Sequence, residues 1–200
     1  MRRTFLGDAL DHWKGSVLSV LAEGGCLRDL AVDAMLTDPN EWQQIDRDLY
    51  AALLRVPVEH IFIDLVAIAA DRVAHFRELL HEGDLFLDPD TGVRTGWVLH
   101  HDRYVTPQEI ETLLPPQQER LLVVYQHVRQ RHVRDRVETV ATALRTADAA
   151  IVGCSCESSN AALLFVSHSP GRVRCAYNAL TAFFQPVAQR RVFLWPPHDG

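Results

Sequence analysis

The feature that most constrains the fold is a short apolar run at residues 84–92 that ends in two carboxylates, a proline and a glycine. The run at 85–87 is too short for a core helix, and turn-forming residues bound it, which is typical of a buried parallel strand. Ligands of open α/β sheets bind outside the carboxyl ends of the strands, so Asp88 and Asp90 are expected beside a ligand. The alternative is a turn in which both aspartates bond their own backbone and Gly92 takes a positive φ.

Strands and helices are expected to alternate along the rest of the chain. Short apolar runs between turn residues predict strands, and apolar residues at helical spacing behind capping residues predict helices. The predicted strands are residues 30–32, 60–64, 84–88, 121–125, 149–153, 161–166 and 192–195. The predicted helices are residues 9–22, one helix or a pair of short ones from 37–41 to 54, 65–80, 106–115, 128–146 and 169–185, with a loop or small hairpin at 92–105. The segment 60–70 could equally belong to the helix that ends near residue 80.

This order predicts an α/β fold with a Rossmann-like, doubly wound, mostly parallel sheet. A polar turn joins the runs 149–153 and 161–166, so they are expected to form an antiparallel hairpin at one edge of the sheet. The chain has 200 residues, of which 48% are hydrophobic, and neither a repeat nor a linker interrupts it. We therefore expect one α/β domain over residues 1–200.

Charge and hydropathy exclude several classes of protein. The formal net charge is −6, so a nucleic acid would have to meet a local basic patch. Asp8 and Asp11 precede the first long apolar run, and no apolar stretch reaches 18 residues. We therefore expect neither a signal peptide nor a membrane span, and a cytoplasmic location.

The cysteines and histidines are expected to hold no metal, because their spacing fits no zinc site and a Cys-Ser-Cys run is a weak signal. The four cysteines are too few for a disulfide scaffold, so we expect reduced and mostly buried thiols. They are Cys26, Cys154, Cys156 and Cys175.

Lys14 is the one lysine among 20 basic residues, the other 19 being arginines. An ammonium is a compact charge with three donors, which a planar guanidinium does not imitate. Lys14 is therefore either a functional residue or a solvated residue on a helix face. Asp11 lies three residues earlier, on the same face of the predicted helix.

The chain resembles, at a distance, the bacterial ribosomal RNA adenine-N6 methyltransferases of the large subunit. Their first segment contains an aromatic residue and a glycine and runs into Asp-x-x-Lys-His, and here residues 5–8 run into Asp11-His12-Trp13-Lys14. Their catalytic Asp-Pro-Pro-Tyr ends a strand, where this chain has Asp88-Pro89-Asp90-Thr91. A parallel sheet with an antiparallel edge is also the layout of class I S-adenosylmethionine methyltransferases. The turn after Asp33 lacks the glycine of that family.

The resemblance implies a methyltransferase-like protein that binds S-adenosylmethionine and acts on nucleic acid. Asp88 would accept a proton or hydrogen bond from the nucleophile, and Asp33 would anchor the cofactor. The implied catalytic residues are Asp88, Asp90 and Lys14. The implied cofactor-binding residues are Asp33, Gly7, Asp8 and Thr37.

Two other functions stay open. Asp8, Asp33, Asp88 and Asp90 could together hold Mg²⁺ or Mn²⁺ in a metal-dependent phosphodiesterase or nuclease. The chain could also be a non-catalytic relative that keeps the fold to bind a partner. The arginines of the predicted helix 128–146 could grip phosphates, although a solvated helix is the simpler interpretation.

The strand tips at Asp33, Asp88 and His127 are expected to converge with Lys14 on one cleft. A carboxylate at a tip that faces a cleft contributes little to core packing. The sequence therefore predicts that Asp88→Asn changes the unfolding free energy by less than about 1 kcal/mol.

Overall fold

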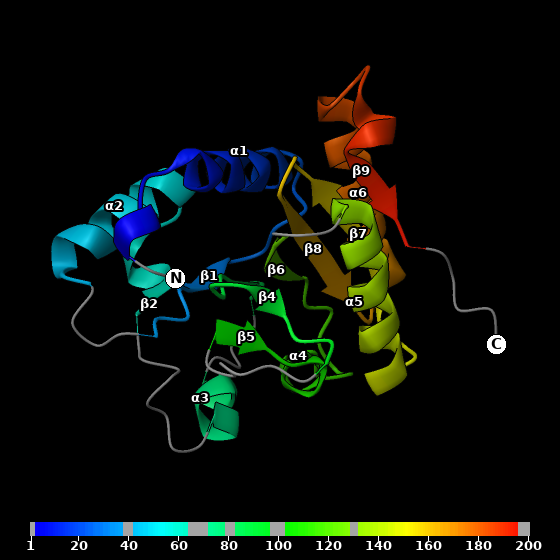
Figure 1. Cartoon of the computed structure of the whole chain (residues 1–200), viewed down its shortest axis with the longest axis horizontal. Helices are drawn as coiled ribbons and strands as arrows, with labels where there is room; N and C mark the ends of the chain where they lie inside the picture. The colour runs from blue at the N-terminus through cyan, green and yellow to red at the C-terminus, as the bar shows by residue number, and fades with distance from the viewer. Residues whose placement is uncertain are drawn as a thin grey trace.

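The computed structural model describes residues 3–37, 42–63, 72–78, 83–96, 103–128 and 132–195, which form an α/β fold around a seven-stranded sheet (Figure 1). The strands lie in the order β2-β1-β3-β6-β8-β7-β9. They are β1 (Ala31–Asp33), β2 (Ile61–Phe62), β3 (Leu85–Leu87), β6 (Leu122–His127), β7 (Val152–Glu157), β8 (Ala161–Ser167) and β9 (Val192–Leu194). The predicted α/β class with a mostly parallel sheet is confirmed.

The strands of the sheet do not all run in one direction. β2, β1, β3 and β6 pair in parallel, and β8 lies antiparallel between β6 and β7. The predicted hairpin is therefore present as β7 and β8, but β9 pairs beyond β7 and takes the edge of the sheet. A separate two-stranded sheet pairs β4 (Gly92–Val93) and β5 (Tyr104–Val105) in parallel, so these strands do not form the hairpin considered for 92–105.

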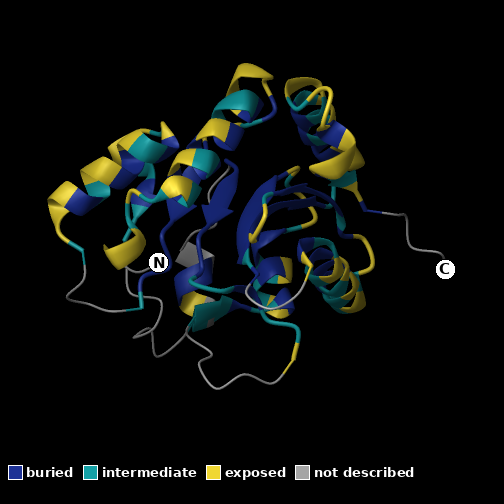
Figure 2. Ribbon diagram, turned by 45° about the horizontal axis from the view of Figure 1, so that its top comes forward, coloured by how far each residue is buried: buried dark blue, intermediate teal, exposed yellow. Residues whose placement is uncertain are grey.

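Helices cover both faces of the sheet, and the strands between them are buried (Figure 2). Strand side chains alternate between the two apolar layers, with Phe86 on one face and Leu85 and Leu87 on the other. The first layer receives α1 (Ala9–Glu23), α2 (Gln44–Leu54) and α6 (Pro170–Phe183), and the second receives α3 (Arg72–Glu78), α4 (Pro107–Leu113) and α5 (Val133–Ala147). In the described part of the chain, no helix is long and apolar enough to cross a bilayer.

The predicted helix starts fare differently. Thr106 caps α4 as expected, in a capping box with Glu109. The helix expected from 37–41 instead begins at Gln44, where Gln43 and Asp46 form the capping box. Residues 38–41, 64–71, 79–82 and 97–102 lie outside the described residues, so the structure bears on only part of the predicted helix 65–80 and of the segment 92–105.

The cysteines correct one prediction. Cys154 and Cys156 are free and buried, as expected. Cys26 and Cys175, however, form a disulfide with their Cα atoms 5.6 Å apart. The spacing along the sequence gave no sign of this bond, because 149 residues separate the two cysteines and only the packing of α6 beside the end of α1 brings them together.

α1 crosses α2 closely at Gly15, where a Cβ atom would overlap the backbone carbonyl oxygen of Leu53. Gly15→Ala should therefore push the two helices apart and lower the unfolding free energy by about 2 kcal/mol, measured by urea denaturation. Gly96→Ala is the matched control, since its Cβ would meet nothing within 4 Å. Equal losses in the two variants would show that the contact at Gly15 does not limit the packing.

Candidate functional site

A cleft with a volume of about 550 Å³ opens at the carboxyl ends of β3 and β6. The start of α1 forms one wall, and the turn between β7 and β8 contributes Asn160. The lining residues are Phe5, Asp8, Leu10, Asp11, Lys14, Asp88, Pro89, Asp90, Tyr125, His127, Val128 and Asn160. The cleft thus lies where open α/β sheets bind their ligands.

Asp88 is the most enclosed carboxylate of the cleft, with 1% of its surface exposed. Nζ of Lys14 donates to Oδ2 of Asp88 at 2.8 Å, and the hydroxyl of Tyr50 donates to the same oxygen. The backbone N–H of Asp88 donates to the carbonyl oxygen of Asp33 at 3.0 Å. Since the described residues give Oδ1 no hydrogen bond, this oxygen is the one left to accept from a ligand.

The ammonium of Lys14 lies between two carboxylates and is 4% exposed. It donates to Oδ1 of Asp11 at 3.0 Å and lies 4.3 Å from the ring centroid of Tyr125. Burial alone lowers the pKa of Lys14, but the charges of Asp88 and Asp11 outweigh it and raise the pKa above the ordinary value. Lys14 therefore stays charged at neutral pH and acts as a fixed cation, not as a base.

The start of α1 is shaped by residues that were predicted to bind a cofactor. The Asp8 carboxylate caps the helix by accepting from the backbone N–H groups of Leu10 at 2.8 Å and Asp11 at 3.2 Å. Gly7, with φ of 84°, places its N–H 2.8 Å from Oδ2 of Asp11. Burial raises the pKa of Asp11. Gly7 and Asp8 thus hold α1 so that Asp11 and Lys14 line the cleft.

Two buried tyrosines contact the charged residues of the cleft, Tyr50 at Asp88 and Tyr125 at Lys14. Burial raises the pKa of Tyr50 and of Tyr125, so both phenols remain protonated and can donate at neutral pH. The ring of Trp42 packs edge-on against Tyr50 at 5.2 Å between centroids. The hydroxyl of Tyr125 lies 3.1 Å from Nδ1 of His127, the residue at the tip of β6.

The Asp33 side chain does not point into the cleft, although the sequence predicts that it would. Its carboxylate is fully buried, accepts from the backbone N–H of Met35 at 2.8 Å and lies 3.0 Å from Nε2 of His75. It is absent from the lining of the cleft. Asp33 therefore organises the turn after β1 and does not face a ligand in the cleft. The predicted convergence of the three strand tips is wrong for this one.

The other predicted residues do come together. Lys14, Asp8, Asp88 and Asp90 all line the cleft. Thr37 reaches it indirectly, because its hydroxyl donates to Oδ2 of Asp90 at 3.4 Å. Of the turn alternative, the positive φ of 117° at Gly92 is present, but the Asp88 carboxylate bonds side chains of α1 and α2 and does not cap its own turn.

Asp11 and Tyr50 were not predicted as site residues. Asp11 could have been found, because it lies one helical turn before Lys14 and faces the same way. Tyr50 carried no such signal, since its position in the middle of α2 is that of an ordinary core aromatic.

The alternative metal site gains no support from the carboxylates. Across the described residues, no group of three or more His, Cys, Asp or Glu side chains could hold a metal ion. Asp33, one of the four proposed ligands, is turned towards His75 instead.

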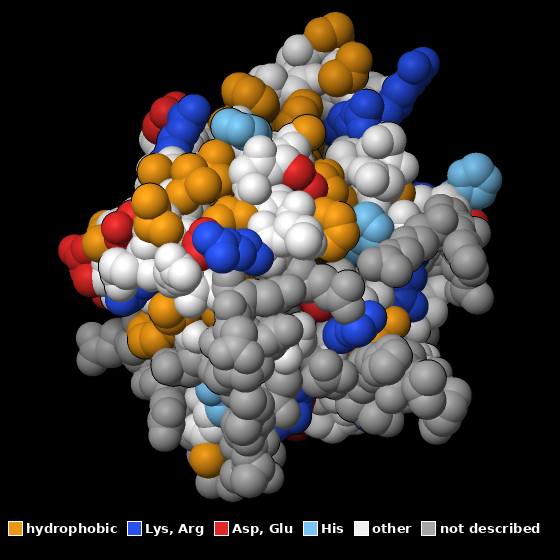
Figure 3. Space-filling view, turned by 60° about the vertical axis from the view of Figure 1, so that its left-hand side comes forward, with side chains coloured by type: hydrophobic (Ala, Val, Ile, Leu, Met, Phe, Trp, Pro, Cys, Tyr) orange, Lys and Arg blue, Asp and Glu red, His pale blue; other side chains and the backbone are white. Residues whose placement is uncertain are grey.

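The arginines of α5 that the structure describes are engaged within the protein. Arg134 donates to Glu157 at 2.9 Å and stacks on the ring of Phe193. Arg136 donates to the carbonyl of Val93 and the hydroxyl of Thr95. Among the described side chains on the face seen in Figure 3, the basic ones are scattered between acidic and apolar ones and form no continuous patch. The predicted grip on phosphates is therefore not supported by these arginines.

Comparisons of the chain with protein-family models, with curated proteins and with solved structures gave no match.

Proposed function

We propose that the chain is an S-adenosylmethionine-binding, methyltransferase-like protein, and that the cofactor binds in the cleft at the tips of β3 and β6. The observation that carries the proposal is the charge of this cleft. Four carboxylates, Asp8, Asp11, Asp88 and Asp90, line it against the single ammonium of Lys14. Such a lining attracts a cationic ligand and repels phosphates. S-adenosylmethionine carries a sulfonium and an ammonium against one carboxylate, so its net charge suits the cleft.

The turn after β1 has no glycine, but its backbone takes a conformation that glycine usually provides. Met35 takes a positive φ of 46°, the backbone conformation for which glycine is usually needed. Its side chain is fully buried in the apolar layer that also receives α3, α4 and α5. Ala34 and Leu36 are buried as well, so the turn supports the proposal by its backbone conformation and not by an open surface.

The side chains of the cleft suggest how a methyl acceptor would be held. S-adenosylmethionine supplies an activated methyl group when bound. Oδ1 of Asp88 would accept a hydrogen bond or a proton from the acceptor atom, while Lys14 and Tyr50 hold Oδ2 in place. Positioning of this kind supplies most of the rate in such a transfer, and the base adds a smaller part.

The acceptor itself is less well supported than the cofactor. The resemblance implies nucleic acid, but neither the acidic cleft nor the engaged arginines of α5 favour a phosphate-rich ligand. The proposal therefore concerns the cofactor, and nucleic acid remains the acceptor only by resemblance.

A titration calorimetry experiment tests the proposal. S-adenosylmethionine should bind saturably without added metal, and Asp90→Asn should weaken binding by about fivefold, because one carboxylate of the cleft is lost. Glu111→Gln on the exposed side of α4 removes the same charge elsewhere and should leave the affinity unchanged. Binding of Mg²⁺ or Mn²⁺ but not of S-adenosylmethionine would favour the phosphodiesterase instead.

A non-catalytic binding protein is the second candidate, favoured by the near-complete burial of Asp88 and its bonds to Lys14 and Tyr50. These bonds occupy Oδ2 of the residue that would act as base. The two candidates separate in an assay with S-adenosylmethionine labelled in its methyl group. Transfer of label to RNA, protein or small molecules of a cell extract supports the enzyme, and binding without transfer supports the second candidate.

A further inference from the structure

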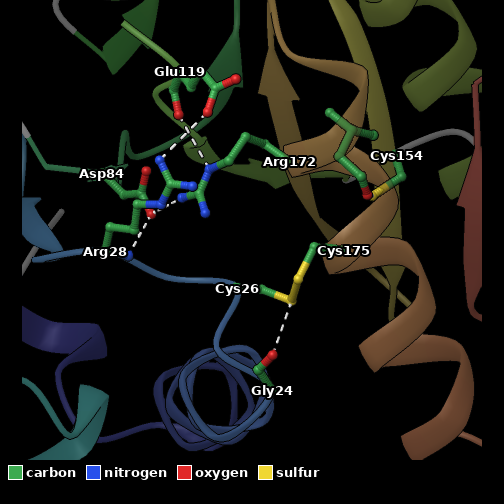
Figure 4. The surroundings of a disulfide bond; sticks show 9 residues. Gly24, Cys26, Arg28, Asp84, Glu119, Cys154, Arg172 and Cys175 are labelled. Atoms are coloured by element: carbon green, nitrogen blue, oxygen red, sulfur yellow. Dashed lines mark hydrogen bonds and ion pairs between the residues drawn. A yellow bond between two sulfur atoms is a disulfide. The ribbon is translucent and has the colours of Figure 1, made fainter.

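α1 is tied to the body of the protein near both ends. Near its N-terminal end, Lys14 is paired with Asp88 at the tip of β3. Beyond its C-terminal end, Cys26 forms the disulfide with Cys175 of α6 (Figure 4). α1 is one unbroken helix of 15 residues, so a shift at one end is transmitted to the other. Breaking the disulfide should therefore affect the position of α1, the helix whose Asp11 and Lys14 line the cleft.

The disulfide lies beside a second junction of the same segments. The Asp84 carboxylate, just before β3, accepts from the backbone N–H of Arg28 at 2.7 Å and from the guanidinium of Arg172 (Figure 4). Arg28 lies two residues after Cys26, and Arg172 lies about one helical turn before Cys175. Since the ion pair is not covalent, it keeps α6 near this segment after reduction without fixing the end of α1 as the disulfide does.

Thiol–disulfide exchange is expected at Cys26 and Cys175, because the other two cysteines are buried free thiols. Burial raises the pKa of the Cys156 thiol to about 12 and that of Cys154 further, so neither forms a thiolate readily at neutral pH. Cys26 is 1% exposed, whereas Cys175 is half-buried, so a reductant reaches the bond from the side of α6.

We propose that the Cys26–Cys175 disulfide forms and breaks reversibly, and that while it is formed it holds α1 in place as one wall of the cleft. We call this disulfide the redox tie. A dithiol reductant attacks the sulfur of Cys175 as a thiolate, the S–S bond breaks, and a mixed disulfide forms. The second thiol of the reductant then displaces Cys175, which leaves two protein thiols and the reductant as its own disulfide. Two electrons and two protons pass to the protein. A cytoplasmic location, which the sequence predicts, would supply such reductants, because thiols are kept reduced there.

Hydrogen exchange of the full chain, read by mass spectrometry before and after dithiothreitol, tests the proposal. Reduction should speed exchange in α1 by about tenfold and leave α5, on the other face of the sheet, unchanged. Cys26→Ser combined with Cys175→Ser should exchange like the reduced protein with or without dithiothreitol. Cys26→Ala with Cys175→Val serves if the serine pair does not fold. Alkylation of all four cysteines in the unfolded, unreduced protein would show that no disulfide exists and would overturn the proposal. An exchange rate in α1 that reduction leaves unchanged, or a rate that rises equally in α5, would overturn it as well.

The tie does not depend on which ligand the cleft takes. S-adenosylmethionine titrated into both redox forms should bind more weakly to the reduced one. Absence of binding in both forms counts against the proposed function alone, because the exchange measurement still decides the redox tie. Equal affinity in both forms counts against the coupling between disulfide and cleft.

Discussion

Asp88→Asn is expected to lower the unfolding free energy by about 3 kcal/mol, measured by urea denaturation at neutral pH. The asparagine would remove the closer of the two carboxylates that balance the buried ammonium of Lys14, and it would weaken the acceptor of Tyr50. Breaking a buried ion pair from one side costs this much because the remaining charge stays desolvated. This reverses the sequence-based expectation of a change below about 1 kcal/mol.

Asp90→Asn is the control for this effect. Asp90 lies two residues later on the same cleft, but it is only half-buried, so its carboxylate is less desolvated than that of Asp88. Its loss should change the unfolding free energy by less than about 1 kcal/mol. If the two variants lost equal stability, the pairing of Asp88 with Lys14 would contribute little, and Asp88 would again be a residue of the cleft alone.

The fold could be read from the sequence where the signal is local. The run at 85–87 between turn residues gave β3, the capping box at Thr106 gave α4, and apolar spacing gave α1. The tips of parallel strands meet at one edge of a sheet, so the nearness of Asp88 to the tip of β6 also followed. Lys14 was singled out by composition, and its place on α1 near the tip of β3 followed from the resemblance.

The rest depends on contacts between distant parts of the chain. Tyr50 meets Asp88 across 38 residues, and Cys26 meets Cys175 across 149. No periodicity reports such a pair, because each residue looks locally like an ordinary core position. The error at Asp33 has a local cause and a distant one. The strand tip was predicted correctly, but one carboxylate oxygen bonds the backbone N–H of Met35, two residues further on, and the other lies beside His75 of α3.

Alkaline pH is expected to unfold the protein steeply between about pH 9 and pH 12. Burial is the first cause of the raised pKa values of Cys154, Cys156, Tyr50 and Tyr125, and carboxylates raise that of Lys14 against its burial. The ordinary values are 9.0 for the thiols, 10.0 for the phenols and 10.5 for the ammonium. Below these values both states hold the protons, and above them only the folded state does.

The stability that these groups provide is thus fully present below pH 9 and is lost as the pH rises towards their folded pKa values. Each proton held only by the folded state removes about 1.4 kcal/mol per pH unit. Denaturant titrations at a series of pH values measure this slope. Tyr50→Phe should make the slope shallower by about one proton above pH 10, because one of these phenols is gone. A slope identical to that of the parent would mean that Tyr50 already ionises in the folded protein, and that it does not hold Asp88 as a neutral donor.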